Sequence, residues 1–262
     1  MKAISLGFIG GGRVVRIYLA ALQHKGIFPE RIVISDPAGE AREVLMKHFP
    51  DQNLVLTGEN SEAARQDIVF LAVHPPVMKD LLPQIGSHLT EETLVVSLVP
   101  KFTFSMISEL LGGHKKLVRM IPNAPSWKNI GFNPTAFAPD LSASDRQQIT
   151  ELLGMLGRMP EVGEDKLEAY AILTAMGPTY FWFQFDELQR LSQSFGLTDT
   201  EFKTGLREML SGAMETLFDG GLNYEEVVDL IPVKPIGDQE EQIREIYRSR
   251  LTTLYQKLSG SN

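Results

Sequence analysis

Cysteine is absent from the 262 residues of this chain. Disulfide bonds, a thiolate nucleophile and cysteine-ligated metal ions are therefore excluded together. Basic residues are also few, because 25 lysines and arginines stand against 33 aspartates and glutamates and give a formal net charge of −8. Proteins that bind nucleic acids or anionic membranes carry dense basic surfaces, so this balance argues against both kinds of partner.

Long apolar runs and clustered histidines are missing as well. No apolar stretch reaches the roughly 18 residues that a bilayer-spanning helix needs. No signal peptide is predicted, because Met1 leads directly into a short apolar run broken by glycines. The five histidines show no ligand spacing on a shared helix face, so no metal site is predicted. We therefore expect a cytoplasmic protein that acts on a small molecule.

Strand-like and helix-like segments alternate over residues 1–163. This alternation predicts βαβ units and therefore an α/β domain with a mainly parallel, Rossmann-type sheet. The expected strands are Ala3–Ile9, Arg31–Ser35, Leu54–Leu56, Asp67–Val73, Thr93–Leu98, Lys116–Ile121 and Thr135–Ala138. The expected helices are Arg13–His24, Ala38–Phe49, Ser61–Gln66 and Ser142–Leu156.

Strand patterns stop near Gly163, and residues 164–262 predict a second, all-helical domain. Its expected helices are Lys166–Met176, Thr179–Phe195, Thr200–Phe218, Tyr224–Leu230 and Gln239–Leu258. The Tyr180–Phe185 stretch is apolar almost all round, so it must be buried inside this monomer or against a partner. About 100 residues of helix bury only a small core alone, which favours a helical domain that forms a homodimer.

The strongest functional motif is GFIGGG at residues 7–12, where the first strand passes into the first helix. Glycines at such a turn let backbone N–H groups approach a diphosphate, and the helix N-terminus adds positive potential. The motif predicts dinucleotide binding, with a purely structural glycine turn as the alternative. Val15 stands where the dinucleotide fingerprint has Gly or Ala, so the helix must repack there. The residues expected to hold the cofactor here are Gly7, Gly10, Gly11, Gly12, Arg13 and Val14.

An acidic residue, Asp36, follows the second expected strand. In dinucleotide sites an acid at this place binds the ribose hydroxyls of NAD and repels the 2′-phosphate of NADP. No Arg or Lys follows before Arg42, so the residues favour NAD while leaving NADP open. The alternative is that Asp36 caps the next helix, and both roles are compatible.

Two further turns are candidate parts of the site, because ligands of open α/β sheets lie beyond the carboxyl ends of the strands. One turn is formed by Ala72, Val73, His74 and Pro75. His74 can donate a proton or a hydrogen bond to the ribose or the substrate, or it is an exposed loop histidine without a role. The other turn carries Asn123 between two prolines, and we expect this amide to face the nicotinamide.

Gly177 and Pro178 in the helical half predict the start of a helix. The free N–H groups of such a start suit a substrate carboxylate, although a simple bend between two core helices is an equal alternative. Thr174 and Tyr180 stand on either side as hydrogen-bond donors.

Four segments of the chain resemble, in order, the landmarks of the pyrroline-5-carboxylate reductase family. They are GFIGGGRVV, DIVFLAVHPPVM, LVRMIPNAPSWKNIG and MGPTYFWFQFDEL. The resemblance covers nearly the whole chain. It implies a Rossmann domain followed by a helical domain that dimerises, sometimes into larger rings, and NAD(P)H-dependent reduction of the cyclic imine 1-pyrroline-5-carboxylate to proline.

The sequence departs from this family mainly in the substrate half. His74 stands where the family's turn has a lysine, and Met176 replaces a small hydroxyl residue. If Pro235 matches the family's proline, Lys234 and Asp238 replace a serine and a threonine in the segment that contacts the substrate. The cofactor half is therefore better preserved than the substrate half.

The motifs and the departures from the family leave three functions open. The first is an imine reductase acting on a small cyclic imino acid, in which placement of the reactants supplies most of the catalysis. The second is an oxidoreductase of another class, acting on a carbonyl, a hydroxyacid or a deazaflavin, and a carbonyl substrate needs a proton donor. The third is a dinucleotide-binding regulatory protein without catalysis. The candidate catalytic residues are Thr174, Tyr180, Lys234 and Asp238.

Overall fold

The computed structural model describes residues 4–260, so Ala3, the expected start of the first strand, lies outside the described residues. The chain divides into two compact units. The first unit runs to Met176 and takes up the chain again from Leu254, and the second unit is Gly177–Thr253. The sequence predicts that strands give way to helices near Gly163. The division between the two compact units falls later in the chain, after Met176.

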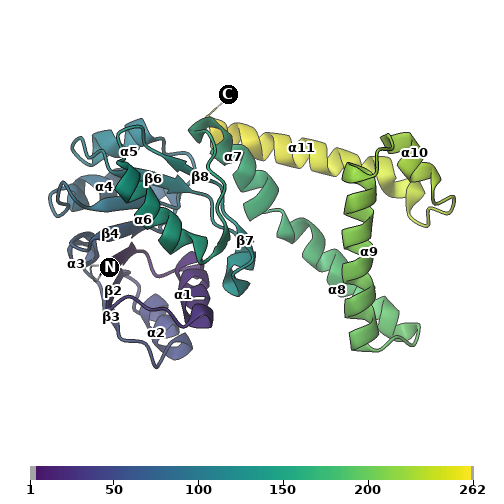
Figure 1. Ribbon diagram of the computed structural model, residues 1–262, viewed down its shortest axis with the longest axis horizontal. Coiled ribbons are helices and arrows are strands. Elements are labelled where there is room, and N and C mark those ends of the chain that lie inside the picture. The colour runs from purple at the N-terminus through teal and green to yellow at the C-terminus, as the bar shows by residue number, and fades with distance from the viewer. Residues whose placement is uncertain (1–3, 261–262) are drawn as a thin grey trace. The chain divides into compact units, whose positions relative to one another are not determined.

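A seven-stranded sheet forms the centre of the first unit within residues 4–260 (Figure 1). The strands lie in the order β3-β2-β1-β4-β5-β6-β8. All neighbours are parallel except β6 and β8, which are antiparallel. The bounds are β1 Ser5–Ile9, β2 Arg31–Ser35, β3 Leu54–Thr57, β4 Ile68–Leu71, β5 Leu94–Ser97, β6 Leu117–Met120 and β8 Thr135–Phe137. This order reverses direction between β1 and β4, as in doubly wound folds, and confirms the predicted Rossmann-type sheet.

Helices cover both faces of this sheet, which is why its strands are apolar runs rather than alternating patterns. One face packs against α1 Arg13–Lys25, α2 Gly39–His48 and α6 Ala143–Gly154. The other face packs against α3 Asn60–Ala64, α4 Met78–Gly86 and α5 Phe104–Leu110. Neither α4 nor α5 was predicted from the sequence. Pro83 inside α4 and the shortness of α5 weaken the helical pattern, and packing on the sheet stabilises both helices instead.

Glycine is required at one position in β1 and at one position in the turn from β1 into α1. Gly10 has φ +99°, and a Cβ there would lie 2.5 Å from the carbonyl oxygen of Ala72. At Gly7 a Cβ would lie 1.9 Å from the carbonyl oxygen of Ala63, so α3 packs directly on β1. Val15, the departure from the fingerprint, is fully buried in the core between sheet and helices. The core therefore accommodates the larger side chain by packing.

Short segments connect the sheet to the helical half. A small sheet pairs β7 Gly131–Phe132 with β9 Gly157–Arg158, and two residues per strand are too few for a sequence pattern to predict. The expected helix Lys166–Met176 is broken into the 3₁₀ turn η3 Glu164–Lys166, α7 Leu167–Tyr170 and the π-helical turn η4 Ala171–Ala175. Such π-helical turns are frequent at functional sites.

The second unit consists of helices. They are α8 Pro178–Ser194, α9 Asp199–Asp219, α10 Tyr224–Asp229 and the part of α11 Glu240–Ser259 that precedes Leu254. Capping boxes begin α9, through Thr198 and Glu201, and α10, through Asn223 and Glu226. Between residues 4 and 260, none of the helices has both the length and the apolarity that crossing a membrane requires.

Candidate functional site

A cavity of about 710 Å³ opens in the first unit, at the carboxyl ends of β1, β4 and β5. Its volume falls within the range of roughly 300–1,000 Å³ that is usual for small-molecule and cofactor sites. The cavity lies where the strand order reverses, which is the place at which open α/β sheets bind ligands. The predicted cofactor residues that line it are Gly11, Gly12, Arg13, Val14, Ala72, Val73, His74 and Pro75.

The beginning of α1 forms one wall of this cavity and suits an anion. The N-cap residue Gly12 provides no side-chain cap, and the first turn carries no acidic side chain. The first N–H groups of a helix have no partner within the helix, so they remain available to a ligand. A Cβ added at Gly12 would meet no atom within 4 Å, so a ligand can approach the backbone there. A diphosphate fits this combination of free amides, open space and the neighbouring Arg13.

Asp36 organises the glycine turn. Its Oδ2 accepts a hydrogen bond from the N–H of Gly11 at 2.8 Å, and its Oδ1 accepts one from the N–H of Ala38 at 2.9 Å. Ala38 is the N-cap residue of α2, so Asp36 supports the start of that helix without occupying the cap position itself. The guanidinium of Arg42 donates to the carbonyl oxygen of Asp36. A cation therefore lies beside the acid that is predicted to bind the ribose.

The turn after β4 brings His74 to the cavity. Ala72 is fixed to β1 because its N–H donates to the carbonyl oxygen of Ile9 at 2.8 Å. His74 is exposed, lines the cavity and precedes the 3₁₀ turn η1 Pro75–Val77. The imidazole is thus placed where it can hydrogen-bond a bound molecule.

Asn123 is buried and engaged with neighbouring backbone. Its Oδ1 accepts from the N–H of Phe132 at 3.1 Å, and its Nδ2 donates to the carbonyl oxygen of Thr174 at 3.5 Å. The Thr174 hydroxyl donates to the carbonyl oxygen of Tyr170 at 2.8 Å. The structure therefore brings these two predicted site residues together. Asn123 joins the turn after β6 to η4, and it is not part of the cavity wall.

Several cavity residues were missed in the sequence. They are Arg16, Glu40, Ala41, Val44, Leu98 and Pro100. Arg16 lies one turn after Arg13 on α1, so helical spacing would have pointed to it. Leu98 and Pro100 follow β5, and the rule that ligands lie at the carboxyl ends of strands would have included their turn. Conversely, Gly7 and Gly10 pack closely against the backbone of Ala63 and Ala72 and are not part of the cavity wall.

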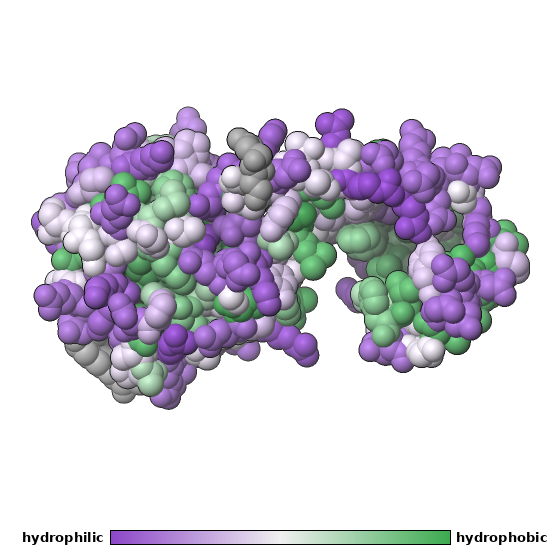
Figure 2. Space-filling view, turned by 90° about the horizontal axis from the view of Figure 1, so that it is seen from above, coloured by the Kyte–Doolittle hydropathy of each residue, from purple (hydrophilic) through white to green (hydrophobic). Residues whose placement is uncertain are grey.

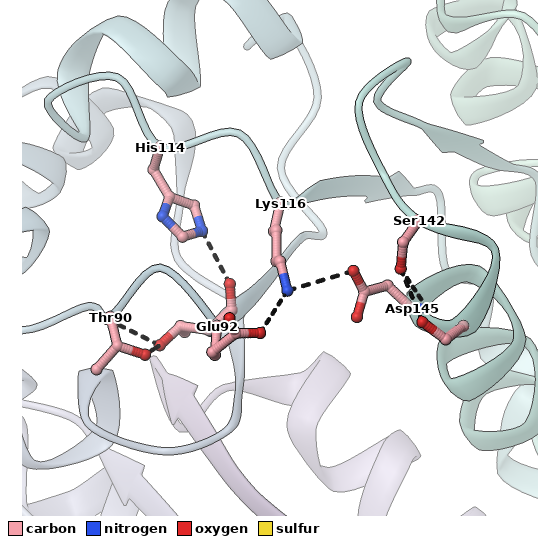
Figure 3. Close-up of polar contacts among 8 residues, drawn as sticks. Thr90, Glu92, His114, Lys116, Ser142 and Asp145 are labelled. Atoms are coloured by element: carbon pink, nitrogen blue, oxygen red, sulfur yellow. Dashed lines mark hydrogen bonds and ion pairs between the residues drawn. The ribbon is translucent and has the colours of Figure 1, made fainter.

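A polar cluster lies at the amino ends of β5 and β6 (Figure 3), and none of its residues lines the cavity. The Nζ of Lys116 lies 2.7 Å from Glu92 Oε2 and 3.4 Å from Asp145 Oδ2. The hydrogen bond that Lys116 donates to the Glu92 carboxylate raises the pKa of Lys116. His114 Nε2 lies 2.9 Å from the carbonyl oxygen of Thr93, and burial lowers the pKa of His114. These contacts join the amino ends of β5 and β6 to α6 and stabilise the fold.

The other predicted catalytic residues lie in the second unit. Lys234 lines a hollow of about 570 Å³ together with Tyr247. The ring of Tyr180 meets the ring of Tyr247 edge-on, with centroids 5.8 Å apart, and burial raises the pKa of Tyr180, with Tyr247 adding to the shift. Asp238 is exposed in the turn η5 Gly237–Gln239 and does not line this hollow. Within the second unit, Tyr180 therefore contacts Tyr247, which lines the same hollow as Lys234, and Asp238 lies outside that hollow.

Comparison with known proteins shows the same relationship in sequence and in fold. A family described as "NADP oxidoreductase coenzyme F420-dependent" matches residues 5–101. Pyrroline-5-carboxylate reductase of Haemophilus influenzae is 27% identical over 79% of this chain and 76% of the relative. Pyrroline-5-carboxylate reductase 2 of Bos taurus is 28% identical over 82% of this chain and 68% of the relative.

Two solved structures have the same fold along the full chain. The pyrroline carboxylate reductase of Plasmodium falciparum with NADP bound superimposes with a TM-score of 0.74 at 19% identity, covering 99% of this chain and 97% of that one. The pyrroline-5-carboxylate reductase of Coxiella burnetii gives a TM-score of 0.68 at 23% identity, covering 99% and 96%. The resemblance predicted from the four motifs is confirmed: pyrroline-5-carboxylate reductases match most of the chain at 22–28% identity, and this chain is an NAD(P)-dependent oxidoreductase similar to them.

Proposed function

We propose that this protein reduces the C=N bond of a small cyclic imino acid, 1-pyrroline-5-carboxylate or a close analogue, with NADH or NADPH. The observation that carries the proposal is the uncapped glycine turn of α1 at the wall of the 710 Å³ cavity. Homology to pyrroline-5-carboxylate reductases over most of the chain supports the choice of an imine as the acceptor. With 1-pyrroline-5-carboxylate as substrate, the reaction belongs to proline biosynthesis.

The chain's own residues account for cofactor binding and for its placement. The amides of Gly12, Arg13 and Val14 bind the diphosphate, and the Arg13 side chain adds a positive charge. Ala72, Val73 and Pro75 form part of the cavity wall, and a nicotinamide bound against them would displace water there. Reduced nicotinamide supplies the hydride when it is bound. A protonated imine needs little further acid, so rigid placement is the main contribution of the protein.

The choice between NAD and NADP depends on the surroundings of Asp36. Its carboxylate opposes a 2′-phosphate. The two backbone amides that it binds and the guanidinium of Arg42 at its carbonyl oxygen reduce that opposition. NADP is bound in the Plasmodium falciparum homologue. We therefore expect NADH to be preferred and NADPH to be accepted.

The direct test is a reductase assay with 1-pyrroline-5-carboxylate, run in parallel with NADH and NADPH. Steady consumption of either cofactor that depends on the imine supports the proposal. Turnover only with carbonyl, hydroxyacid or deazaflavin acceptors contradicts it and favours an oxidoreductase of another class. Cofactor binding without turnover in a broad substrate screen favours a regulatory protein.

The substitutions in the substrate half are the reason for keeping the second candidate, an oxidoreductase of another class. Lys234 lines the same hollow of the second unit as Tyr247. Tyr180, whose ring meets Tyr247, carries its phenolic proton at neutral pH, and burial raises its pKa further. A phenol and an ammonium group are proton donors, which a carbonyl substrate requires and a protonated imine does not.

We propose that the second unit forms a homodimer with a second copy of this chain. Phe181, Trp182 and Phe183 are consecutive on α8, and their side chains are 46%, 52% and 68% exposed. The second unit by itself therefore does not enclose this helix. Apolar side chains are open to solvent on this unit (Figure 2), over more surface than single scattered residues provide. The further exposed residues are Leu188, Leu191, Met209, Met214, Phe218, Leu230, Ile231, Val233 and Ile236.

Sedimentation equilibrium tests this assembly. We expect a dimer for the unchanged protein and a shift toward monomer for Phe183→Asp, because a charge in a buried apolar interface is strongly unfavourable. The matched control is Gln193→Asp, which adds the same charge to α8 at an exposed polar position. A monomer at all concentrations of the unchanged protein contradicts the proposal.

A further inference from the structure

The turn after β5 reaches the cavity and has an unusual backbone. Leu98 and Pro100 line the cavity, and the next residue, Lys101, has φ +76°. Residues with a Cβ rarely adopt this left-handed region, and they persist there only when the surroundings hold them. Something outside the turn must therefore fix Lys101, and with it Pro100.

Two glutamates from the segment after β9 hold this turn. Glu168 on α7 accepts a hydrogen bond from the N–H of Lys101, with Oε1 and nitrogen 3.0 Å apart. Glu164 in η3 accepts one from the N–H of Phe104 at 2.6 Å. The two carboxylates thus accept hydrogen bonds from the first and the last residue of the segment 101–104.

A buried arginine holds the two glutamates in turn. Arg119 lies on β6 beside β5, and its side chain is about 2% exposed. Its Nη1 lies 2.9 Å from Glu164 Oε1, and its Nη2 lies 2.7 Å from Glu168 Oε1. Two carboxylates four residues apart repel each other unless a cation lies between them. The buried guanidinium in turn needs both of them, because an unpaired buried charge is strongly unfavourable.

We propose that Glu168, held by Arg119, is a positioning residue for hydride transfer. Its carboxylate keeps Lys101 in the left-handed conformation and thereby keeps Pro100 in the wall of the cavity. The inference rests on the proposed function in one respect, namely that this cavity holds the cofactor. A displacement of about 1 Å in such a wall is enough to lower a rate by about 100-fold.

Limited proteolysis tests, without any cofactor, whether Glu168 holds the turn at Lys101 in place. Trypsin cleaves after lysine, and Lys101 is exposed. In Glu168→Ala the turn loses its acceptor, so we expect cleavage between Lys101 and Phe102 to become faster than in the unchanged protein. The matched control is Glu92→Ala, which removes an exposed glutamate at the amino end of β5. Equal cleavage rates in all three proteins overturn the proposal.

A rescue experiment tests whether holding this turn in place supports catalysis. Glu168→Ala is expected to lower kcat by about 10- to 100-fold. Glycine adopts positive φ without strain, so adding Lys101→Gly should recover a large part of kcat. It should not recover the melting temperature, because Arg119 still lacks one of its partners. A merely structural role for Glu168 predicts the opposite, namely that kcat follows the melting temperature and is not rescued.

The outcomes separate this inference from the function on which it rests. If the unchanged protein turns over no acceptor, the proposed function fails, and the positioning role fails with it. If the unchanged protein is active and Glu168→Ala has the same kcat as Glu92→Ala, only the positioning role is overturned. Glu168→Gln keeps the hydrogen-bond acceptor and serves if the alanine variant does not fold. Glu168→Gln should then lower kcat by less than the about 10- to 100-fold expected for alanine. Adding Lys101→Gly should again recover part of that loss.

Discussion

Alanine in place of Gly12 tests the diphosphate site without disturbing the fold. A Cβ at Gly12 meets no protein atom within 4 Å, and φ is −77°, a value that any residue adopts. The cost to folding is therefore only that of alanine at an N-cap, about 1 kcal/mol or less. The same methyl group points into the space through which a phosphate must approach the amides. Losing a hydrogen bond to a charged group costs about 1.5–3 kcal/mol, which is about 10- to 150-fold in Kd.

Gly10→Ala provides the contrast. There φ is +99°, and the new Cβ would lie 2.5 Å from the carbonyl oxygen of Ala72. Left-handed strain of about 1–2 kcal/mol and overpacking of about 1–3 kcal/mol add to about 2–5 kcal/mol. That loss lowers the melting temperature by about 5–15 °C.

The assays are titration of intrinsic fluorescence with NADH and thermal unfolding followed by circular dichroism. Gly154→Ala serves as the control, since Gly154 lies on α6 with open space around it and does not line the cavity. We expect Gly12→Ala to lose affinity and keep its melting temperature, and Gly10→Ala to lose both. If Gly12→Ala binds NADH as well as the unchanged protein does, the diphosphate does not lie on this turn, and the argument for a dinucleotide site is refuted.

Three further predictions concern single side chains. Asp36→Ser removes the acid that is predicted to bind the ribose, so the ratio of kcat/KM for NADH to that for NADPH should fall; an unchanged ratio in parallel assays rules out this role. Tyr18→Phe removes a buried hydroxyl that has no hydrogen-bond partner among residues 4–260, so the free energy of unfolding in urea should rise by about 1 kcal/mol; a decrease would show that the hydroxyl is bonded. Burial lowers the pKa of His114 below 6.5, with Lys116 adding to the shift, so the unfolded chain takes up the proton first as the pH falls. The free energy of unfolding should therefore decrease below about pH 6.5, and His114→Gln should remove the contribution of His114 to this decrease. A pH profile of His114→Gln identical to that of the unchanged protein would exclude this contribution.

Much of the first unit was predictable because its signals are local. Arg31–Ser35 reads as a strand from five residues, and the structure gives β2 the same bounds. The glycine turn was recognisable because Gly10 needs both a positive φ and a close approach to Ala72, which only glycine permits. α4 was not predictable in this way, because Pro83 opposes the helical pattern and packing on the sheet overrides it.

The candidate site was predictable only in part. The turns after β1 and β4 follow from the rule that ligands lie at the carboxyl ends of strands. The turn after β5 obeys the same rule, but Leu98 and Pro100 carry no polar group that draws attention to them. A charge inside the apolar strand around Arg119 does signal a buried partner, but the sequence does not say which acid it meets.

The sequence by itself determined the alternation of strands and helices in the first half, the glycine turn and the resemblance to a family, because each depends on residues that are neighbours in the chain. Tertiary structure alone decided that Arg119 meets Glu164 and Glu168, which are 45 and 49 residues away. It also decided that Pro100 faces the same cavity as Gly12. Such contacts depend on which strands lie side by side, and strand order is set by the packing of the whole sheet rather than by any local pattern.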